Sequence, residues 1–346
     1  MFFPILLQII YYNILKKILR IILNFVVFPS IGIFLLYLAF KDVDIHKLWS
    51  DIKNANFYWI GLSLVFAFLA FISRALRWIL LIEPLGYNPN KKNTILAVFI
   101  AYFANMAMPR LGEITRCGSL SKTDNIPMDK LVGTVITERV IDFITLLLMI
   151  FFVLIIKFKK VGGFFNNEIF NPLYNNYFSK YIFWIIIISA LVFSVGFLFL
   201  MRQKLMGMSV FQRINNFIKG LSEGLKSVFR IKKLRLFFAH TLFIWIMYVL
   251  MTYVVFFAIE PTRNLTFTDS FFILTIGGIG MSAPVQNGFG AYHWIVSNGL
   301  LMVLNIPIEG GLSYATICHE SQTLMVLFTG PIAMFLVLFA KKKKIT

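Results

Sequence analysis

The sequence predicts an all-α protein that crosses a membrane several times, and three observations support this fold class. Hydrophobic residues make up 59% of the 346 positions and charged residues only 14%, which lies outside the usual range of soluble domains. The apolar residues form runs of about 20, the length that a helix needs to cross a bilayer core of about 30 Å. These runs lack strand-like alternation, so we expect the spanning elements to be helices, which satisfy their own backbone polar groups.

The basic residues are placed as membrane anchors rather than as a nucleic-acid surface. The formal net charge is +18, but the lysines and arginines gather in short segments beside the apolar runs, as topology signals do. No basic face interleaved with stacking aromatics is found, so no nucleic-acid partner is predicted. Cys117 and Cys318 have neither metal-ligand spacing nor a disulfide framework, and we expect both to be packing residues.

Six full spans and two broken helical elements are expected in chain order. Residues 1–20 lack a signal-peptide pattern and are predicted to form an interfacial helix. The spans are expected at about 21–40, 58–82, 131–156, 181–201, 236–259 and 314–340. Two apolar stretches interrupted by proline and glycine lie between them, at about 94–116 and 268–304. Together they form one transmembrane domain, 21–340, with halves at about 21–156 and 181–340, followed by a basic tail at 341–346.

Basic segments fix the expected topology. The segment 202–235 holds the largest positive excess, and lysines close the chain at 341–344. These segments and the amino-terminal basic residues all face the cytoplasm only if each broken element enters and leaves on one side. We therefore predict two re-entrant helical hairpins of opposite orientation, related as an inverted repeat. Both termini are therefore expected in the cytoplasm.

The first broken element places charges inside an apolar stretch. Its helical run from about Thr94 to Met108 ends at Pro109, and charged residues follow at once. A charge at membrane depth costs about 2.5 to 3.5 kcal/mol on insertion scales, so such residues normally face a cavity or one another. The predicted substrate-binding residues of this half are Arg74, Arg77, Asn105, Arg110, Glu113, Arg116, Glu138, Arg139 and Asp142, with Pro109 and Gly112 at the break.

Two interpretations of these charges remain open. In the first interpretation the charges have only a structural role. The acidic residues Glu113, Glu138 and Asp142 then neutralise neighbouring arginines as buried pairs, or some of the charges lie at the membrane interface. In the second interpretation the arginines bind an anionic ligand, because they outnumber these carboxylates. Arginine binds phosphate through two parallel hydrogen bonds, and the ends of broken helices offer free N–H groups to the same ligand. The second interpretation predicts a phosphate-bearing head group.

The second broken element is rich in glycine and uncharged. Its glycines and Pro284 permit sharp turns and a close backbone approach, but no strand precedes them and no nucleotide-loop lysine follows. We expect an anionic head group to lie nearer the first element for this reason. Further on, His319 and Glu320 begin like a zinc-protease helix but lack its second histidine, so no metal site is predicted. The predicted substrate-binding residues of this half are Gln286, Asn287, Gly288, Gly290, His293, His319 and Glu320.

At these residues the chain resembles the flippase-like transmembrane domain family of lysylphosphatidylglycerol synthases, which also occurs as stand-alone membrane proteins. The resemblance covers nearly the whole chain. It rests on Arg74, Arg77 and Trp78, on Asn105, Pro109, Arg110, Gly112, Glu113 and Arg116, and on Glu138, Arg139 and Asp142. The family's second-half pattern of Pro, Gly-Gly-x-Gly and Glu appears here with Asn287 in place of a glycine and His293 in place of the glutamate.

The resemblance implies a lipid translocase that moves an anionic phospholipid or a lipid phosphate between leaflets, through a cavity between the two hairpins. It also implies a location in the bacterial cell (inner) membrane. It does not imply lysyl transfer, because the sequence holds no soluble aminoacyl-transferase domain. An alternative is an accessory protein that binds a lipid-linked precursor for a cell-envelope enzyme such as a glycosyltransferase. An intramembrane enzyme is the third hypothesis, disfavoured because no nucleophile or metal set accompanies the acids. No cofactor is expected, and the oligomeric state is left open.

Overall fold

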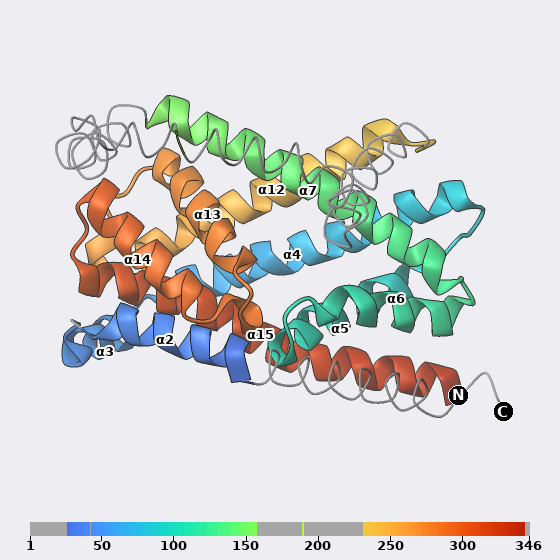
Figure 1. The fold of residues 1–346 in the computed structure, drawn as a ribbon, viewed down its shortest axis with the longest axis horizontal. Coiled ribbons are helices and arrows are strands. Elements are labelled where there is room, and N and C mark those ends of the chain that lie inside the picture. The colour runs from blue at the N-terminus through green and yellow to red at the C-terminus, as the bar shows by residue number, and fades with distance from the viewer. Residues whose placement is uncertain (1–25, 42, 158–188, 190–230, 343–346) are drawn as a thin grey trace. The chain divides into compact units, whose positions relative to one another are not determined.

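The computed structural model describes residues 26–41, 43–157, 189 and 231–342 of the chain (Figure 1). This described part is helical and contains no strand. Its α-helices are α2 (Phe28–Phe40), α3 (Ile45–Lys53), α4 (Phe57–Ile82), α5 (Lys91–Ala107), α6 (Leu111–Asp124), α7 (Met128–Ile156), α12 (Leu234–Val255), α13 (Phe267–Ser282), α14 (Ala291–Leu304) and α15 (Ile308–Lys342). Short 3₁₀ turns are η2 (Glu83–Leu85), η5 (Phe256–Ala258), η6 (Glu260–Thr262) and η7 (Gln286–Gly288).

Four helical segments are long and apolar enough to cross a membrane, as judged by length and composition. They are Phe57–Leu85, Met128–Ile156, Leu234–Ala258 and Ile308–Phe339, and they coincide with four of the six expected spans. The chain is therefore an all-α membrane protein. The expected span at 21–40 is described only from residue 26, and the expected span at 181–201 lies outside the described residues apart from Ser189. The count of six spans stays a prediction, and the interfacial helix at 1–20 also lies outside the described residues.

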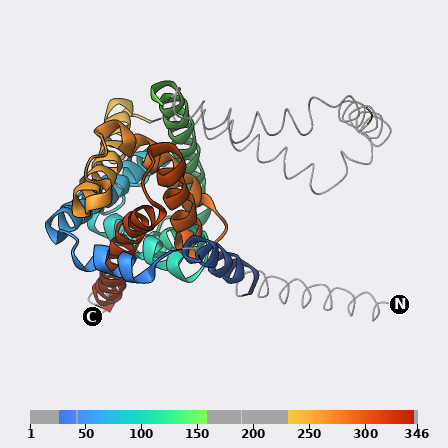
Figure 2. The ribbon, with the colours of Figure 1, turned by 90° about the vertical axis from the view of Figure 1, so that its left-hand side faces the viewer.

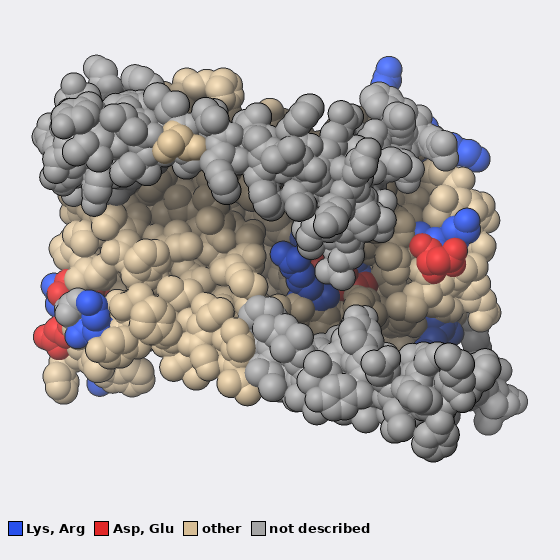
Figure 3. Space-filling model, in the orientation of Figure 1, with Lys and Arg blue, Asp and Glu red and all other residues tan. Residues whose placement is uncertain are grey.

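The outward surface of these helices is apolar, as expected of a protein that faces lipid. Large hydrophobic side chains such as Leu242, Phe328 and Leu338 are exposed by 64%, 69% and 65%. Most of the described surface on the face drawn in Figure 3 carries no charged side chain. A soluble domain would bury such residues or keep them scattered, so lipid is the solvent that fits this surface.

The contacts between its residues divide the chain into two compact units. The first comprises Met1–Val135 and Ile231–Thr346, and the second comprises Ile136–Arg230. The helix α7 begins in the first unit and continues into the second. All the contacts reported below lie within the first unit.

The centre of the first unit is the pair α4 and α12, which lie side by side in Figures 1 and 2. The close packing depends on small side chains, because Ala67, Ala70 and Ala75 on α4 are fully buried. A buried hydrogen bond from the Ser63 hydroxyl to the Met251 carbonyl oxygen, 3.0 Å long, joins the two helices. The N–H of Asn56 also donates to the Ala258 carbonyl oxygen at 2.8 Å.

Both broken elements form helical hairpins that pack around α15. The helices α5 and α6 lie side by side (Figure 1), and α13 packs against α14 across η7. The helix α15 contacts both α5 and α14, and η7 itself contacts α5. The break of the second hairpin therefore lies against a helix of the first. Entry and return of each hairpin on one side of the bilayer stays a prediction.

Candidate functional site

The break of the first hairpin is built by Asn105 and Gly112. The helix α5 ends at Ala107, and α6 begins at Leu111 after Pro109 and Arg110. The side-chain oxygen of Asn105 accepts a hydrogen bond of 2.7 Å from the Gly112 N–H, which satisfies one of the orphan donors at the start of α6. A Cβ atom on Gly112 would lie 2.8 Å from Asn105 Cγ and would overlap the Ala101 carbonyl oxygen. Only glycine allows α5 and α6 to approach this closely.

Arg110 lies at this break in an unfavourable backbone conformation. Its φ of 62° and ψ of 12° fall in the left-handed region, which costs a residue other than glycine about 1 to 2 kcal/mol. The side chain is exposed, and among the described residues it makes no hydrogen bond or ion pair. Strained residues of this kind cluster at binding sites. The fold thus holds a guanidinium, at an energetic cost, where it is open to a ligand.

Two further arginines of the predicted set are buried on α4, where they contact uncharged polar groups. Arg74 Nη1 donates to the hydroxyl oxygens of Tyr102 on α5, at 3.0 Å, and of Tyr248 on α12, at 3.3 Å. Arg77 Nη1 donates to Thr241 Oγ1 on α12 at 3.3 Å. These bonds tie α4 to both neighbouring helices and fix the orientation of the guanidinium groups.

Arg116 on α6 is buried and lies over an aromatic ring. Its Cζ atom is 4.7 Å from the centroid of the Trp78 ring on α4, within the range of a cation–π interaction. The Trp78 indole N–H donates in turn to Thr134 Oγ1 at 2.8 Å. This contact anchors the first hairpin to α4.

The acidic residues of the predicted set lie in different places. Glu113 is half-buried on α6 in the first unit. Glu138, Arg139 and Asp142 lie on the part of α7 that belongs to the second unit, where Glu138 is buried, Asp142 is half-buried and Arg139 is exposed. The pairing of these α7 residues with the arginines of the first hairpin stays a prediction.

The break of the second hairpin uses two residues in the left-handed region and one buried contact. Asn287 has a φ of 48° and Gly290 a φ of 80°, and a Cβ atom on Gly290 would overlap the Gly32 carbonyl oxygen of α2. The Asn287 side chain donates to Thr323 Oγ1 on α15 at 3.1 Å. Gln286 is half-buried and Gly288 is buried, while Pro284, just before η7, is exposed.

The remaining three predicted residues meet between α14 and α15. His319 Nδ1 lies 2.8 Å from Glu320 Oε1, and His293 Nε2 lies 3.5 Å from the same oxygen. The two imidazole centroids are 5.0 Å apart. The other nitrogen of His319, Nε2, lies 2.8 Å from the backbone carbonyl oxygen of Asn287 in η7. This cluster therefore connects the second break, α14 and α15.

Sequence reasoning missed the partners of the arginines. Tyr102, Tyr248, Thr241 and Thr134 were not among the predicted site residues, and Trp78 entered only through the resemblance. The hydroxyl groups on apolar helices carry a weak sequence signal, because tyrosine and threonine are common in membrane spans for other reasons. The conspicuous signal was Trp78 itself, a large indole directly after Arg77 that must find a partner for its N–H when it is buried.

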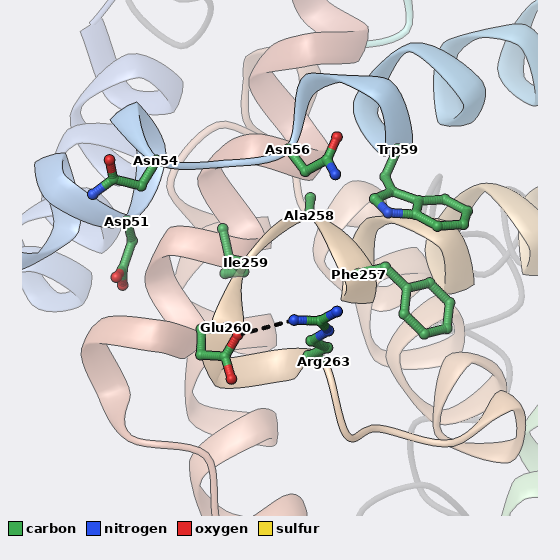
Figure 4. A pocket seen from close by; sticks show the side chains of 9 residues that line it. All are labelled: Asp51, Asn54, Asn56, Trp59, Phe257, Ala258, Ile259, Glu260 and Arg263. Carbon is green, nitrogen blue, oxygen red and sulfur yellow. Dashed lines mark ion pairs between the residues drawn. The ribbon is translucent and has the colours of Figure 1, made fainter.

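A separate pocket lies away from all the predicted residues. It is lined by Asp51, Asn54, Asn56, Trp59, Phe257, Ala258, Ile259, Glu260 and Arg263 (Figure 4). The Glu260–Arg263 ion pair at its edge has an N–O distance of 3.6 Å and is exposed, so it stabilises the fold little. Arg263 is thus an exposed arginine that lies outside the candidate site.

Comparisons with known proteins found a matching family and a similar membrane protein. Residues 21–330 match the model of a family described as lysylphosphatidylglycerol synthase TM region. The chain is also 31% identical over 125 residues to the UPF0104 membrane protein MJ1595 of Methanocaldococcus jannaschii, a match that covers 35% of this chain and 37% of the relative. The matched segment thus spans little more than a third of that relative. No solved structure matches the chain.

Proposed function

Because the chain belongs to the lysylphosphatidylglycerol synthase transmembrane-region family, we propose that it moves an anionic phospholipid or a lipid phosphate between membrane leaflets. The family is associated with membranes and lipids. The proposal adds a path, in which the lipid head group passes the two helix breaks. It does not include lysyl transfer.

The observation that carries the proposal is Arg110 at the break of the first hairpin. Its backbone is held in a strained left-handed conformation, and such strained residues cluster at ligand-binding sites. A phosphate group fits, because arginine binds it through two charge-assisted hydrogen bonds. The amino-terminal end of α6 begins at the next residue and adds its positive dipole end.

The buried arginines support the same ligand. Arg74 and Arg116 come from two different helices, and each is oriented by aromatic or hydroxyl groups. Both guanidinium groups are buried, so a phosphate would have to replace part of their present contacts. A path for a head group past Arg110, with the acyl chains left in the lipid, would be lined by these residues.

The topology of this proposal uses both hairpins. We place them as re-entrant elements that enter from opposite faces, so that their breaks meet within the bilayer. The contact between η7 and α5 supports this arrangement. The six spans, the cytoplasmic location of both termini and the location in the cell membrane belong to the same proposal, and they rest on the distribution of the basic segments. The bacterial origin expected from the resemblance has no support in the comparisons, since the relative found is archaeal.

Replacing Arg74 by glutamine tests whether the buried arginines serve the lipid. Glutamine keeps a polar side chain with an amide donor at this position but removes the charge and is shorter, so exchange of a labelled phosphatidylglycerol between the leaflets of proteoliposomes is expected to slow by at least about tenfold. That factor corresponds to about 1.4 kcal/mol, at the lower end for a hydrogen bond to a charged group.

The matched control is Arg263→Gln, which removes an exposed arginine outside the site and should leave exchange unchanged. The proposal fails if Arg74→Gln exchanges the lipid at the wild-type rate. It also fails if both variants slow exchange equally, because the effect would then follow net charge rather than the site.

A further inference from the structure

The cluster of His293, His319 and Glu320 has the ligand set of a transition-metal site. Each residue offers one ligand atom, and these atoms all lie within 4.8 Å of one another. Two imidazoles and a carboxylate are the ligands that zinc takes in many proteins, whereas magnesium and calcium prefer oxygen atoms. The second histidine that the sequence around His319 lacks is supplied from α14, 26 positions earlier in the chain.

Both ring nitrogens of His319 face groups that accept hydrogen bonds. Its Nε2 faces the Asn287 carbonyl oxygen at 2.8 Å, which only accepts, so Nε2 carries the proton. The Nδ1 atom of a neutral ring then holds a lone pair, and it faces the carboxylate oxygen of Glu320 at 2.8 Å. Two lone pairs at this distance repel each other unless a proton or a metal cation lies between the two atoms.

The same hydrogen bond is the outer contact that metal-bound histidines make. A ligating imidazole almost always donates its second N–H to a carbonyl or carboxylate oxygen, which fixes the tautomer and the ring orientation. His319 has this arrangement with the backbone of η7. A metal bound at Nδ1 would therefore find its ligand already oriented.

His293 provides an independent sign of a missing partner. Its side chain is 2% exposed, and its Nδ1 atom has no hydrogen-bond partner in the described part of the chain. Burying an imidazole with so few polar contacts is unfavourable. A metal bond at Nε2 would add a strong contact to this ring, although it would leave Nδ1 as it is. Aromatic rings lie beside the pair: the ring centroid of Tyr292 is 5.3 Å from that of His319, and the ring centroid of Phe289 is 5.9 Å from that of His293.

We propose that His293 Nε2, His319 Nδ1 and a Glu320 oxygen bind a divalent transition metal of the zinc class. Three protein ligands leave a fourth position for water or another small oxygen ligand. The metal joins α14 to α15 and, through Asn287, holds the break of the second hairpin. This site is distinct from the arginines of the first hairpin, and it adds a bound metal to the proposed lipid translocation without depending on it.

The test is zinc binding by the full chain, purified in detergent without a histidine tag and stripped with a chelator. The chain contains four histidines, so each can be replaced by glutamine in turn. Competition with a chromophoric chelator is expected to give about one zinc ion per wild-type chain. Affinity should fall at least tenfold in His293→Gln and in His319→Gln, because loss of an outer-shell partner alone costs about 10- to 100-fold and these residues are proposed as direct ligands. His46→Gln, at an exposed residue of α3, and His240→Gln, on α12, should bind zinc as the wild type does.

Cobalt in place of zinc gives a second readout that folding defects do not mimic. Cobalt bound at the wild-type site is expected to show the visible absorption of a four-coordinate ion, and Glu320→Gln should change that spectrum. The proposal is overturned if the wild-type chain binds no zinc, in which case a proton holds His319 and Glu320 together. It is also overturned if all four histidine variants bind zinc equally well.

Discussion

Replacing Arg110 by glycine is expected to abolish most leaflet exchange while the protein remains at least as stable as the wild type. The change removes the exposed guanidinium and also relieves the left-handed conformation, φ 62°, which glycine adopts without cost. Loss of a hydrogen bond to a charged group corresponds to about 1.5 to 3 kcal/mol, so exchange of labelled phosphatidylglycerol should fall by about ten- to a hundredfold. The free energy of unfolding should stay the same or rise by up to about 1 kcal/mol.

Asn125→Gly is the matched control for this experiment. Asn125 follows the other end of α6 and is also left-handed, with a φ of 56°, so glycine relieves the same kind of backbone strain without removing an arginine. Exchange should be unchanged in this variant. Wild-type exchange by Arg110→Gly, or an equal loss in Asn125→Gly, would show that the arginine side chain does not bind the lipid.

Replacing Gly112 by alanine is expected to give the largest loss of stability of any single methyl addition on α6. The new Cβ atom would meet the backbone carbonyl of Ala101 and the amide of Asn105, and the backbone cannot move aside as a flexible side chain does. Overpacking of this kind costs about 1 to 3 kcal/mol, and opening the hairpin would also break the 2.7 Å bond from the Gly112 N–H to Asn105. Thermal unfolding in detergent measures the effect.

Gly118→Ala on the same helix is the control, because a Cβ atom there meets nothing within 4 Å. Alanine is a better helix former than glycine by about 1 kcal/mol, so this variant should be slightly more stable than the wild type. Equal melting temperatures for the two alanine variants would contradict the close approach of α5 and α6 at Gly112.

The helices and the breaks could be predicted because their causes are local. Long apolar runs predicted the four candidate spans, and Pro109 placed the end of α5 within two residues. The pairs within the site could not be predicted, since they join residues far apart in sequence. Arg74 and Tyr248 are 174 positions apart. The pattern of residues along one helix does not predict which residues of another helix it will contact.

His293 illustrates the same limit for the second half. The residue stood out as a departure from the family pattern, and His319 stood out as half of a metal motif. The link between them arises because the chain reverses between the end of α14 at Leu304 and the start of α15 at Ile308. The two helices pack against each other, and the two ring centroids lie 5.0 Å apart. A zinc-protease helix carries both histidines on one face, so the motif is local there, but here the second ligand comes from tertiary packing.

The most direct test of lipid translocation is leaflet exchange by the purified wild-type chain alone. Liposomes that contain phosphatidylglycerol labelled in one leaflet should lose the asymmetry of the label much faster with the protein than without it, and a labelled zwitterionic lipid should move more slowly than the anionic one. An unchanged rate of exchange with correctly folded protein would contradict the proposed function. Binding of the lipid without movement, together with co-purification of a cell-envelope enzyme, would then identify the chain as an accessory subunit.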